Sequence, residues 1–154
     1  MKSAATCLAL REPSHLCELV ATFASKMPTD AERAQKARER GDTLRAQGQG
    51  KEALAAYDRA LEIDPTHASI WSGRAAALIS LQRYEEALAA SERSLELDPE
   101  SADAWANKGV ALRRLQRYEE ALAASEHALE LDPKNDVAWD NKGRVLQERR
   151  QKAP

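Results

Sequence analysis

The stretch QRYEEALAASERSLELDP at residues 82–99 returns as QRYEEALAASEHALELDP at residues 116–133, and the two copies agree at 16 of 18 positions. The copies are 34 residues apart. The same interval separates three prolines and three tryptophans, which are Pro65, Pro99 and Pro133, and Trp71, Trp105 and Trp139. Self-similarity at a fixed period of this length predicts a repeat architecture, in which each unit is one supersecondary element.

Each repeat unit contains two segments with helical periodicity. In the second unit, Trp71, Ala75 and Leu78 share one face of a helix expected over residues 68–81. A second helix is expected over residues 84–97, and Pro99 follows its end because proline disfavours helix at the residue before it. One such hairpin cannot bury its apolar stripe alone, so the units must stack on one another. The predicted fold class is therefore all-α, an α-solenoid of antiparallel helix pairs.

The rest of the repeat region follows the same plan. Thr29 and Glu32 have the spacing of a capping box, which predicts a helix that starts there and runs to residue 46. Gly48 and Gly50 interrupt it. Further helices are expected over residues 51–63, 102–115 and 136–151, with one more starting at residue 118.

Residues 1–28 lie outside the repeats. Leu16, Leu19, Val20, Phe23 and Met27 fall at helical spacing, which predicts a short amphipathic helix near residues 15–26. An isolated helix of this length is marginal in water. We therefore expect it to pack on the repeats, to pack on another chain, or to remain partly frayed.

Composition excludes several classes of function. The net charge of −2 offers no basic field for nucleic acid. No apolar run approaches the roughly 18–20 residues of a membrane span, and the start of the chain lacks the pattern of a signal peptide. Two cysteines, Cys7 and Cys17, do not make a disulfide scaffold, which favours a reduced, cytoplasmic setting.

Catalytic and metal-binding chemistry finds no support. His67 and His127 have no nucleophile at a defined spacing. Cys7, His15 and Cys17 supply three metal-ligating residue types, but they lack a fourth and match no common zinc spacing. We expect no enzyme activity, no cofactor and no metal.

The order Trp, Gly or Ala, Leu, Tyr, Ala, Ala, Pro over 34 residues resembles the tetratricopeptide repeat (TPR) family. The resemblance covers repeats at residues 34–67, 68–101 and 102–135, followed by a capping helix at 136–151. It places a TPR domain at residues 29–154 after an N-terminal extension at 1–28. The resemblance implies a right-handed superhelix and a non-catalytic protein–protein interaction adaptor, which binds a peptide or protein segment in its concave groove.

The two helical layers of the repeats differ in how they vary. Second helices are almost identical between the last two repeats, whereas the first helices at 68–81 and 102–115 agree at only five of 14 positions. Packing restrains one layer, so the first helices are the expected recognition layer. By resemblance, the groove contacts are Arg38, Asp42, Arg45, Ser72, Asp103, Asn107, Val110, Arg113, Arg114, Asp140, Asn141 and Arg144. The resemblance also places at the groove Gln35, Ser69, Ala76, Ile79, Ala106, Val137 and Gln147.

Five arginines oppose three aspartates among these groove positions. Arginine binds carboxylates bidentately, so an extended ligand of acidic character is expected. The alternative is a solvated charged surface with no fixed partner. A separate cationic series, Arg40, Arg74, Lys108 and Lys142, is either a row of donors to a peptide or a set of long stems packed along neighbouring helices.

One family function is tested by the sequence itself. TPR co-chaperones hold acidic heat-shock chaperone tails with a clamp of Lys, Asn and Arg side chains. The corresponding positions here are Arg38, Asp42, Gly73, Asp103 and Asn107, of which only Arg38 keeps the chemistry. Two carboxylates would repel an acidic tail, so a chaperone tail is not the expected partner.

Two other interpretations remain open. The chain is expected to be a monomer, but the N-terminal helix could instead make it a structural module, by covering the groove or by mediating homo-oligomerisation as a dimer. TPR arrays also serve as docking domains for enzymes. The sequence names neither the partner nor the pathway.

Overall fold

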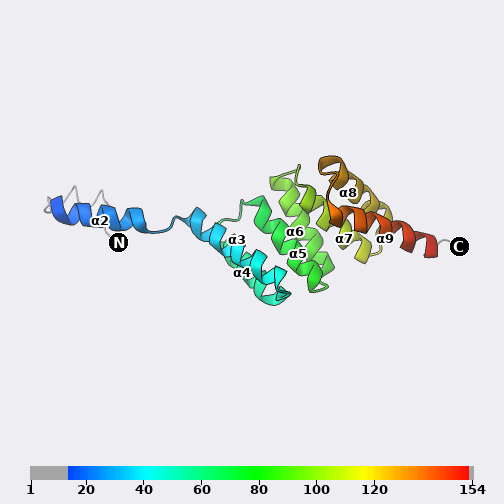
Figure 1. The fold of residues 1–154 in the computed structure, drawn as a ribbon, viewed down its shortest axis with the longest axis horizontal. Helices are drawn as coiled ribbons and strands as arrows, with labels where there is room; N and C mark the ends of the chain where they lie inside the picture. Colours follow the sequence, from blue (N-terminus) through cyan, green and yellow to red (C-terminus); the bar gives the residue numbers. More distant parts are fainter. Residues whose placement is uncertain (1–13, 153–154) are drawn as a thin grey trace.

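The computed structural model of this chain describes residues 14–152, which form eight α-helices (Figure 1). Their bounds are α2 Ser14–Lys26, α3 Asp30–Ala46, α4 Gly50–Ile63, α5 Ala68–Ser80, α6 Tyr84–Leu97, α7 Ala102–Arg114, α8 Tyr118–Leu131 and α9 Asp136–Lys152. Two expectations from the sequence concern residues outside this range: that the chain has no leader, and that Cys7 could be a metal ligand.

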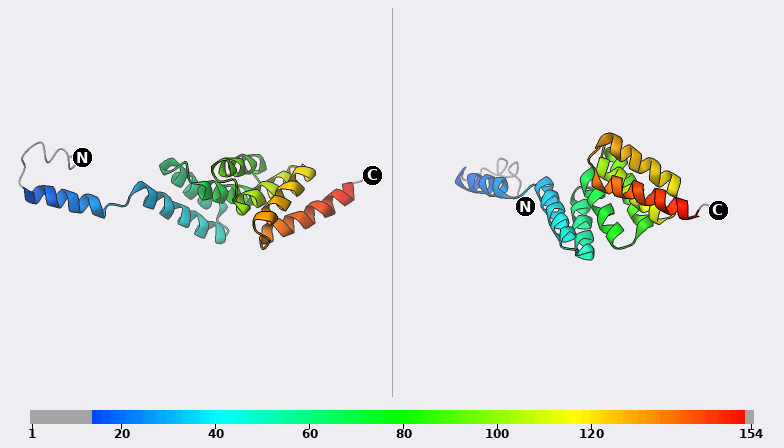
Figure 2. Two further views of the ribbon diagram at one scale, coloured as in Figure 1. Left: turned by 90° about the horizontal axis from the view of Figure 1, so that it is seen from above. Right: turned by 45° about the vertical axis from the view of Figure 1, so that its right-hand side comes forward.

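Seven of these helices, α3 to α9, stack into one solenoid (Figures 1 and 2). Helices α3 and α4, α5 and α6, and α7 and α8 form the three pairs, and each pair packs on the next one along the chain. Helix α9 closes the stack against α7 and α8. The predicted all-α solenoid is confirmed, and the first helices of the pairs are themselves in contact along one layer.

Tryptophan and proline share a 34-residue spacing because they are hydrogen-bonded partners. The indole Nε1 of Trp71 donates to the carbonyl oxygen of Pro65 at 2.8 Å. The equivalent bonds from Trp105 to Pro99 and from Trp139 to Pro133 measure 2.8 and 2.9 Å. Each bond ties the first turn of a first helix to the loop that precedes it. The proline therefore ends one repeat and orients the start of the next.

The turn inside each repeat uses the left-handed backbone region. Gly48, Gln82 and Gln116 occupy the same repeat position, with φ values of 76°, 60° and 63°. A left-handed conformation costs an L-residue about 1–2 kcal/mol, and only glycine avoids this cost. The two glutamines keep the geometry because the turn is closed around them; for example, the Arg83 amide donates to the Leu78 carbonyl at 3.0 Å.

Small residues let first and second helices approach closely around the ring of Tyr57. This side chain is fully buried, and a Cβ added at Gly41 or at Gly73 would lie 2.7 or 2.6 Å from its ring. The later repeats place Ser91 and Ser125 at the position of Tyr57. In the first repeats, one large ring thus fills the space beside two glycines, whereas smaller side chains fill the equivalent space in the later repeats.

We expect Gly41→Ala and Gly143→Ala to have opposite effects on stability, although both glycines hold the same repeat position. At Gly41 the new methyl group meets a buried ring that cannot swing away, and such overpacking costs about 1–3 kcal/mol. At Gly143 no atom lies within 4 Å, so the substitution keeps the helix-propensity gain of up to about 1 kcal/mol. Urea unfolding of the two variants measures both; equal shifts would contradict the close-approach argument.

Helix α2 contacts no other helix of the described chain. It leads away from the solenoid and joins α3 through three residues, 27–29 (Figures 1 and 2). Its apolar side chains are exposed to solvent, with Phe23 66% and Leu19 55% exposed. The predicted helix therefore exists, and in this structure it neither packs on the repeats nor lies in their groove.

The start of α3 confirms the predicted capping box. The Thr29 hydroxyl accepts from the Glu32 amide at 3.2 Å, and the Glu32 carboxylate accepts from the Thr29 amide at 2.7 Å. These two bonds end the linker and fix where the repeat region begins.

No helix within residues 14–152 is both long and apolar enough to cross a membrane.

Candidate functional site

A groove with a cavity of about 380 Å³ runs along the layer of first helices. Helices α3, α5 and α7 contribute most of its lining, and α9 adds one residue at its end. The lining residues are Arg38, Asp42, Arg45, Ser69, Ser72, Gly73, Ala76, Ser101, Asp103, Ala106, Asn107 and Val137. The groove therefore lies on the layer in which the repeats differ most.

Six of the twelve predicted contact residues line this groove: Arg38, Asp42, Arg45, Ser72, Asp103 and Asn107. Sequence comparison did not single out Ser101, whose hydroxyl caps α7 by accepting from the Ala104 amide at 3.3 Å. Its signal was available, since a serine directly before a helical segment is a typical N-cap.

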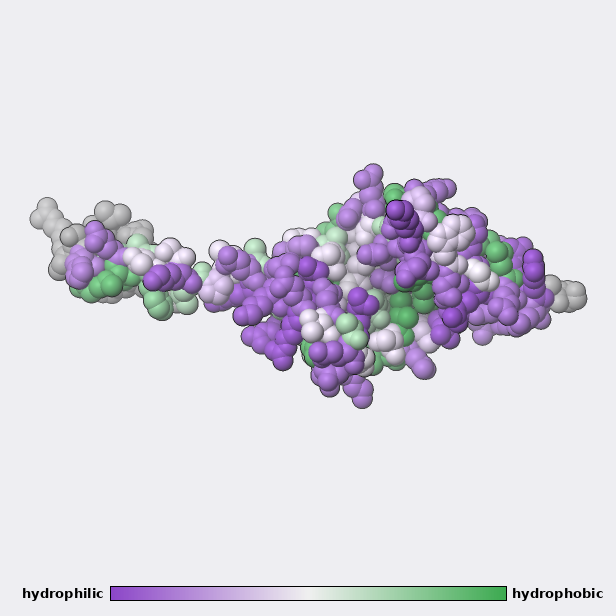
Figure 3. All heavy atoms as spheres, in the orientation of Figure 1, coloured by the Kyte–Doolittle hydropathy of each residue, from purple (hydrophilic) through white to green (hydrophobic). Residues whose placement is uncertain are grey.

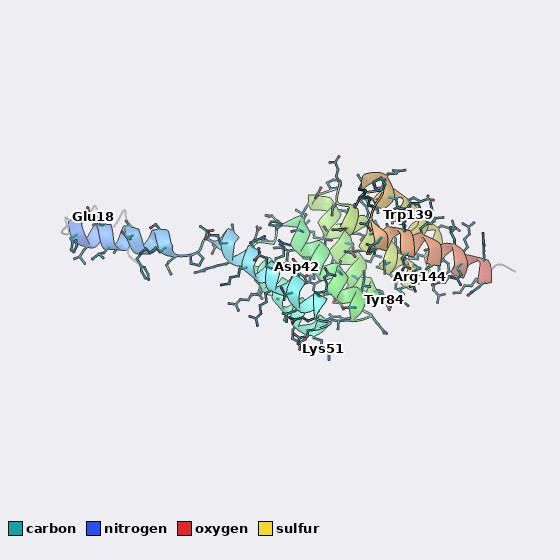
Figure 4. The ribbon with its side chains drawn as sticks, viewed as in Figure 1. Glu18, Asp42, Lys51, Tyr84, Trp139 and Arg144 are labelled. Atoms are coloured by element: carbon teal, nitrogen blue, oxygen red, sulfur yellow. The ribbon has the colours of Figure 1, made fainter. Side chains whose placement is uncertain are left out.

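The α3 wall of the groove is built on the carboxylate of Asp42, which Figure 4 labels. Asp42 accepts from Arg38 Nη1 at 2.8 Å and from the Tyr57 hydroxyl at 2.6 Å. Burial raises the pKa of Tyr57 to about 12, and the hydrogen bond to Asp42 adds to the rise while Arg45 opposes it. The core tyrosine thereby holds a groove carboxylate in place, and Arg38 compensates its charge.

This arrangement predicts a loss of stability at alkaline pH that depends on Tyr57. The unfolded chain releases the tyrosine proton near pH 10, whereas the folded chain retains it to about pH 12. The folded state binds more protons in that interval, so the free energy of unfolding falls by about 1.4 kcal/mol per pH unit there. The contribution is fully present below pH 10.

We expect the difference in unfolding free energy between wild type and Tyr57→Phe to be constant from pH 7 to 9 and to shrink above pH 10. Urea unfolding across this range provides the measurement, and the subtraction removes the titration of lysines. Tyr84→Phe serves as the control, because it retains Tyr57 and should follow the wild-type profile. A constant difference up to pH 12 would show that Tyr57 is not protected.

The opposite wall is held by contacts between successive first helices. Asn107 Nδ2 donates to the carbonyl oxygen of Ser72 at 3.2 Å and approaches its hydroxyl at 3.3 Å. The Asp103 carboxylate accepts from Asn135 Nδ2 at 3.1 Å and is itself exposed. The asparagine and the aspartate are thus positioned by packing and still border the groove.

Four predicted contacts lie outside the groove lining. Val110 is half-buried. Arg144 and Asp140 pair with each other on α9 at 2.7 Å and are both exposed. The Arg114 guanidinium lies 5.7 Å from the ring centre of Tyr84.

Two further predictions, Arg113 and Asn141, are corrected by burial. Arg113 is 6% exposed and Asn141 is 1% exposed. Arg113 donates to the Asn141 side-chain oxygen at 2.8 Å and to Glu148 at 2.6 Å, and Asn141 donates to the Ser125 hydroxyl at 2.8 Å. Both side chains join α7 to α8 and α9, so they are not free to contact a ligand.

Arg113→Ala should therefore lower the free energy of unfolding more than Arg114→Ala does, although the two arginines are adjacent. Removing Arg113 leaves a buried carboxamide and a carboxylate without their donor, and hydrogen bonds to charged groups contribute about 1.5–3 kcal/mol. Removing Arg114 loses only its cation–π contact over the half-buried ring of Tyr84, and such contacts near the surface contribute about 0.5–1 kcal/mol. Thermal and urea unfolding measure both; a smaller loss for Arg113 would refute its structural role.

Three of the four residues in the cationic series, Arg74, Lys108 and Lys142, connect neighbouring repeats. Arg74 pairs with Asp58 at 2.7 Å, and the ion pairs of Lys108 with Glu92 and of Lys142 with Glu126 measure 3.3 and 3.0 Å. Each cation reaches back to the second helix of the preceding repeat. Each also lies over the tryptophan three residues before it, at 5.4–5.9 Å from the ring centre.

The charge of the groove is balanced. Of the five arginines predicted to face it, only Arg38 and Arg45 contribute to its lining, opposite Asp42 and Asp103. The predicted basic surplus is therefore not found in the lining. Within residues 14–152, no group of three His, Cys, Asp or Glu side chains is placed to hold a metal ion.

A stack of helix pairs with a groove along its first helices defines a helical-repeat protein. Tetratricopeptide repeat profiles match residues 44–109 and 102–135. The chain belongs to the tetratricopeptide repeat family. A search of curated proteins finds no matching relative.

Solved TPR domains share this fold. The Arabidopsis OM64 TPR domain is 27% identical with a TM-score of 0.72, over 77% of this chain and 98% of that one. The first TPR of Spaghetti (RPAP3), bound to the HSP90 peptide SRMEEVD, is 27% identical with a TM-score of 0.71, over 77% and 94%. The second TPR domain of human RPAP3, in complex with the HSP70 peptide SGPTIEEVD, is 27% identical with a TM-score of 0.69, over 76% and 98%.

Proposed function

We propose that this protein is a non-catalytic adaptor that binds an extended segment of another protein in the groove of its first helices. The groove itself carries the proposal, because three successive first helices each place polar side chains along one continuous cavity of about 380 Å³. Recognition of peptides by related TPR domains supports it. An extended backbone needs donors and acceptors along its length, and this lining supplies both.

The ligand chemistry follows from which groove charges are already paired. Arg38 is compensated by Asp42, whereas Arg45 is exposed and has no carboxylate partner among residues 14–152. We therefore assign Arg45 the contact with an acidic side chain of the ligand. Asp103, near the start of α7, is exposed and suits a backbone N–H or a basic side chain. The proposed ligand is an extended segment with one acidic residue opposite Arg45.

Chaperone tails fit this groove poorly. The tails bound by the related domains end in EEVD, a cluster of carboxylates. Asp42 and Asp103 present carboxylates on the walls that such a tail would contact. The carboxylates of the tail and of the groove would repel each other, and Arg38 is already paired with Asp42. We propose that the partner is not a heat-shock chaperone tail.

Selection of random peptides displayed on phage against the immobilised protein supplies a ligand. Fluorescence anisotropy with the best selected peptide then measures its affinity. Arg45→Glu should weaken binding about 10- to 100-fold, because a charge-assisted hydrogen bond of about 1.5–3 kcal/mol is replaced by repulsion. The matched control is Arg59→Glu, which makes the same charge change at an exposed site on the second helix α4.

Equal loss of affinity in the two arginine variants would indicate a general charge effect and refute the groove assignment. Peptide binding that survives both variants would place the ligand elsewhere on the solenoid. The peptide SRMEEVD, measured in parallel, should bind at least 10-fold more weakly than the selected ligand. Tighter binding of SRMEEVD would overturn the proposed ligand class while leaving groove binding intact.

A further inference from the structure

The last helix of the solenoid, α9, presents an uncovered face that belongs to the repeat pattern. Trp139, Gly143 and Leu146 hold the positions at which Trp105, Gly109 and Leu112 occur in α7. Trp139, labelled in Figure 4, lies on this helix. It is 55% exposed, and Leu146 is 38% exposed. An added Cβ at Gly143 would meet nothing within 4 Å.

The equivalent face of α7 shows what such a face normally packs against. Leu112 is 1% exposed, and the ring centre of Trp105 lies 4.5 Å from that of His127 on α8. An added Cβ at Gly109 would lie 2.8 Å from the Ser125 hydroxyl of the same helix. A second helix therefore covers this face within a complete repeat. Among residues 14–152, no helix does so for α9.

Helix α2 of the same chain also has apolar side chains that no described helix covers. Helix α2 has 13 residues against 14 for α8, and no described helix covers it. The exposed apolar residues of α2 and of the first linker position are Leu16, Leu19, Val20, Phe23 and Met27. They gather on the arm that extends from the solenoid (Figure 3). Among residues 14–152, therefore, no helix packs on the apolar side chains of α2, and none packs on the apolar face of α9.

We infer that α2 of one copy packs on the uncovered face of α9 of a second copy, in the place that a second helix holds in each complete repeat. The interface continues the stacking already present between α7 and α8. Phe23 and its neighbours supply the apolar contacts, and Gly143 provides room for close approach of the two helices. The contact is head-to-tail, so it can propagate beyond a dimer.

The α2 helix cannot cover α9 of its own chain. Its linker of three residues spans at most about 11 Å. First helices α3, α5, α7 and α9 succeed one another at about 8–10 Å each, so the uncovered face lies roughly 25–30 Å from α3. The two helices also lie at opposite ends of the molecule (Figure 1). An α2 helix that covers α9 therefore comes from a second copy.

The groove is a poorer site for α2 than the α9 face. The groove walls carry Arg38, Asp42, Arg45 and Asp103, whose charged groups would be desolvated by an apolar helix without new partners. Burial of apolar surface against apolar surface has no such cost. The α9 face is therefore the preferred site, and occupation of the groove by α2 becomes an outcome that the test can reveal.

Sedimentation velocity of the full chain over a range of concentrations tests the inference. The weight-average mass should rise from that of one 17.0 kDa chain toward more than two chains. Phe23→Glu and Leu146→Glu should each remain monomeric, because each places a carboxylate in one half of the interface. Val137→Glu is the matched control: Val137 is 45% exposed on α9 but lines the groove, so association should persist.

Mixing the two monomeric variants gives the sharpest result. Phe23→Glu retains an intact α9 face and Leu146→Glu retains an intact α2, so an equimolar mixture should form one contact and sediment as a pair of chains. Circular dichroism of each variant verifies that the helices are kept.

Three outcomes would overturn the inference. A wild-type chain that is monomeric at all concentrations removes the contact. Association that is lost with Phe23→Glu but kept with Leu146→Glu means that α2 pairs with α2 of the other copy. Loss of association with Val137→Glu but not with Leu146→Glu means that α2 occupies the groove. Binding of peptides in the groove is measured separately, so its failure leaves this interface untouched.

Discussion

Each first helix in this protein buries its apolar face against the second helix that follows it, and each pair packs on the next pair along the chain. The dependence is visible in three leucines at one repeat position, since Leu78 and Leu112 are buried whereas Leu146, on the face of α9 that no described helix covers, is 38% exposed. Tryptophan sets the spacing of the pairs through its hydrogen bond to the preceding proline carbonyl. The period of 34 residues is therefore the length of chain needed to form one helix pair and to reach the start of the next.

The same stacking decides which side chains can act on a ligand. Second helices must match their neighbours on two sides, so they hardly vary, whereas first helices keep one side open to the groove. Stacking also buries some of the residues that the repeat pattern assigns to the groove. Arg113 and Asn141 occupy positions that face the groove in principle, yet near the last helix they connect α7, α8 and α9 through buried hydrogen bonds. A repeat position therefore does not assign a role without its neighbours.

Prediction from sequence succeeded where the signal was local or periodic. Helix limits followed from caps and prolines; α6 spans Tyr84–Leu97 as predicted, and α4 begins one residue earlier than expected, at Gly50. The glutamines with positive φ escaped notice because glutamine carries no turn signal of its own, and the closed turn imposes the conformation. Of the residues predicted to contact a ligand, Arg38, Asp42 and Asn107 are among those that line the groove. The basic surplus was not found there, because exposure of an arginine depends on contacts 28 and 35 residues away.

The sequence by itself determined the repeat period, the helices, their caps and the existence of an amphipathic helix at the start of the chain. These depend on contacts within a few residues and on spacing, which a linear pattern records. Only the tertiary structure decided that Asp42 is held by Tyr57, that Arg74, Lys108 and Lys142 form bridges between repeats, and that no described helix covers α2 or the α9 face. The reason is physical: burial and pairing depend on which surfaces meet in space, and a side chain's partner in a solenoid lies one repeat away.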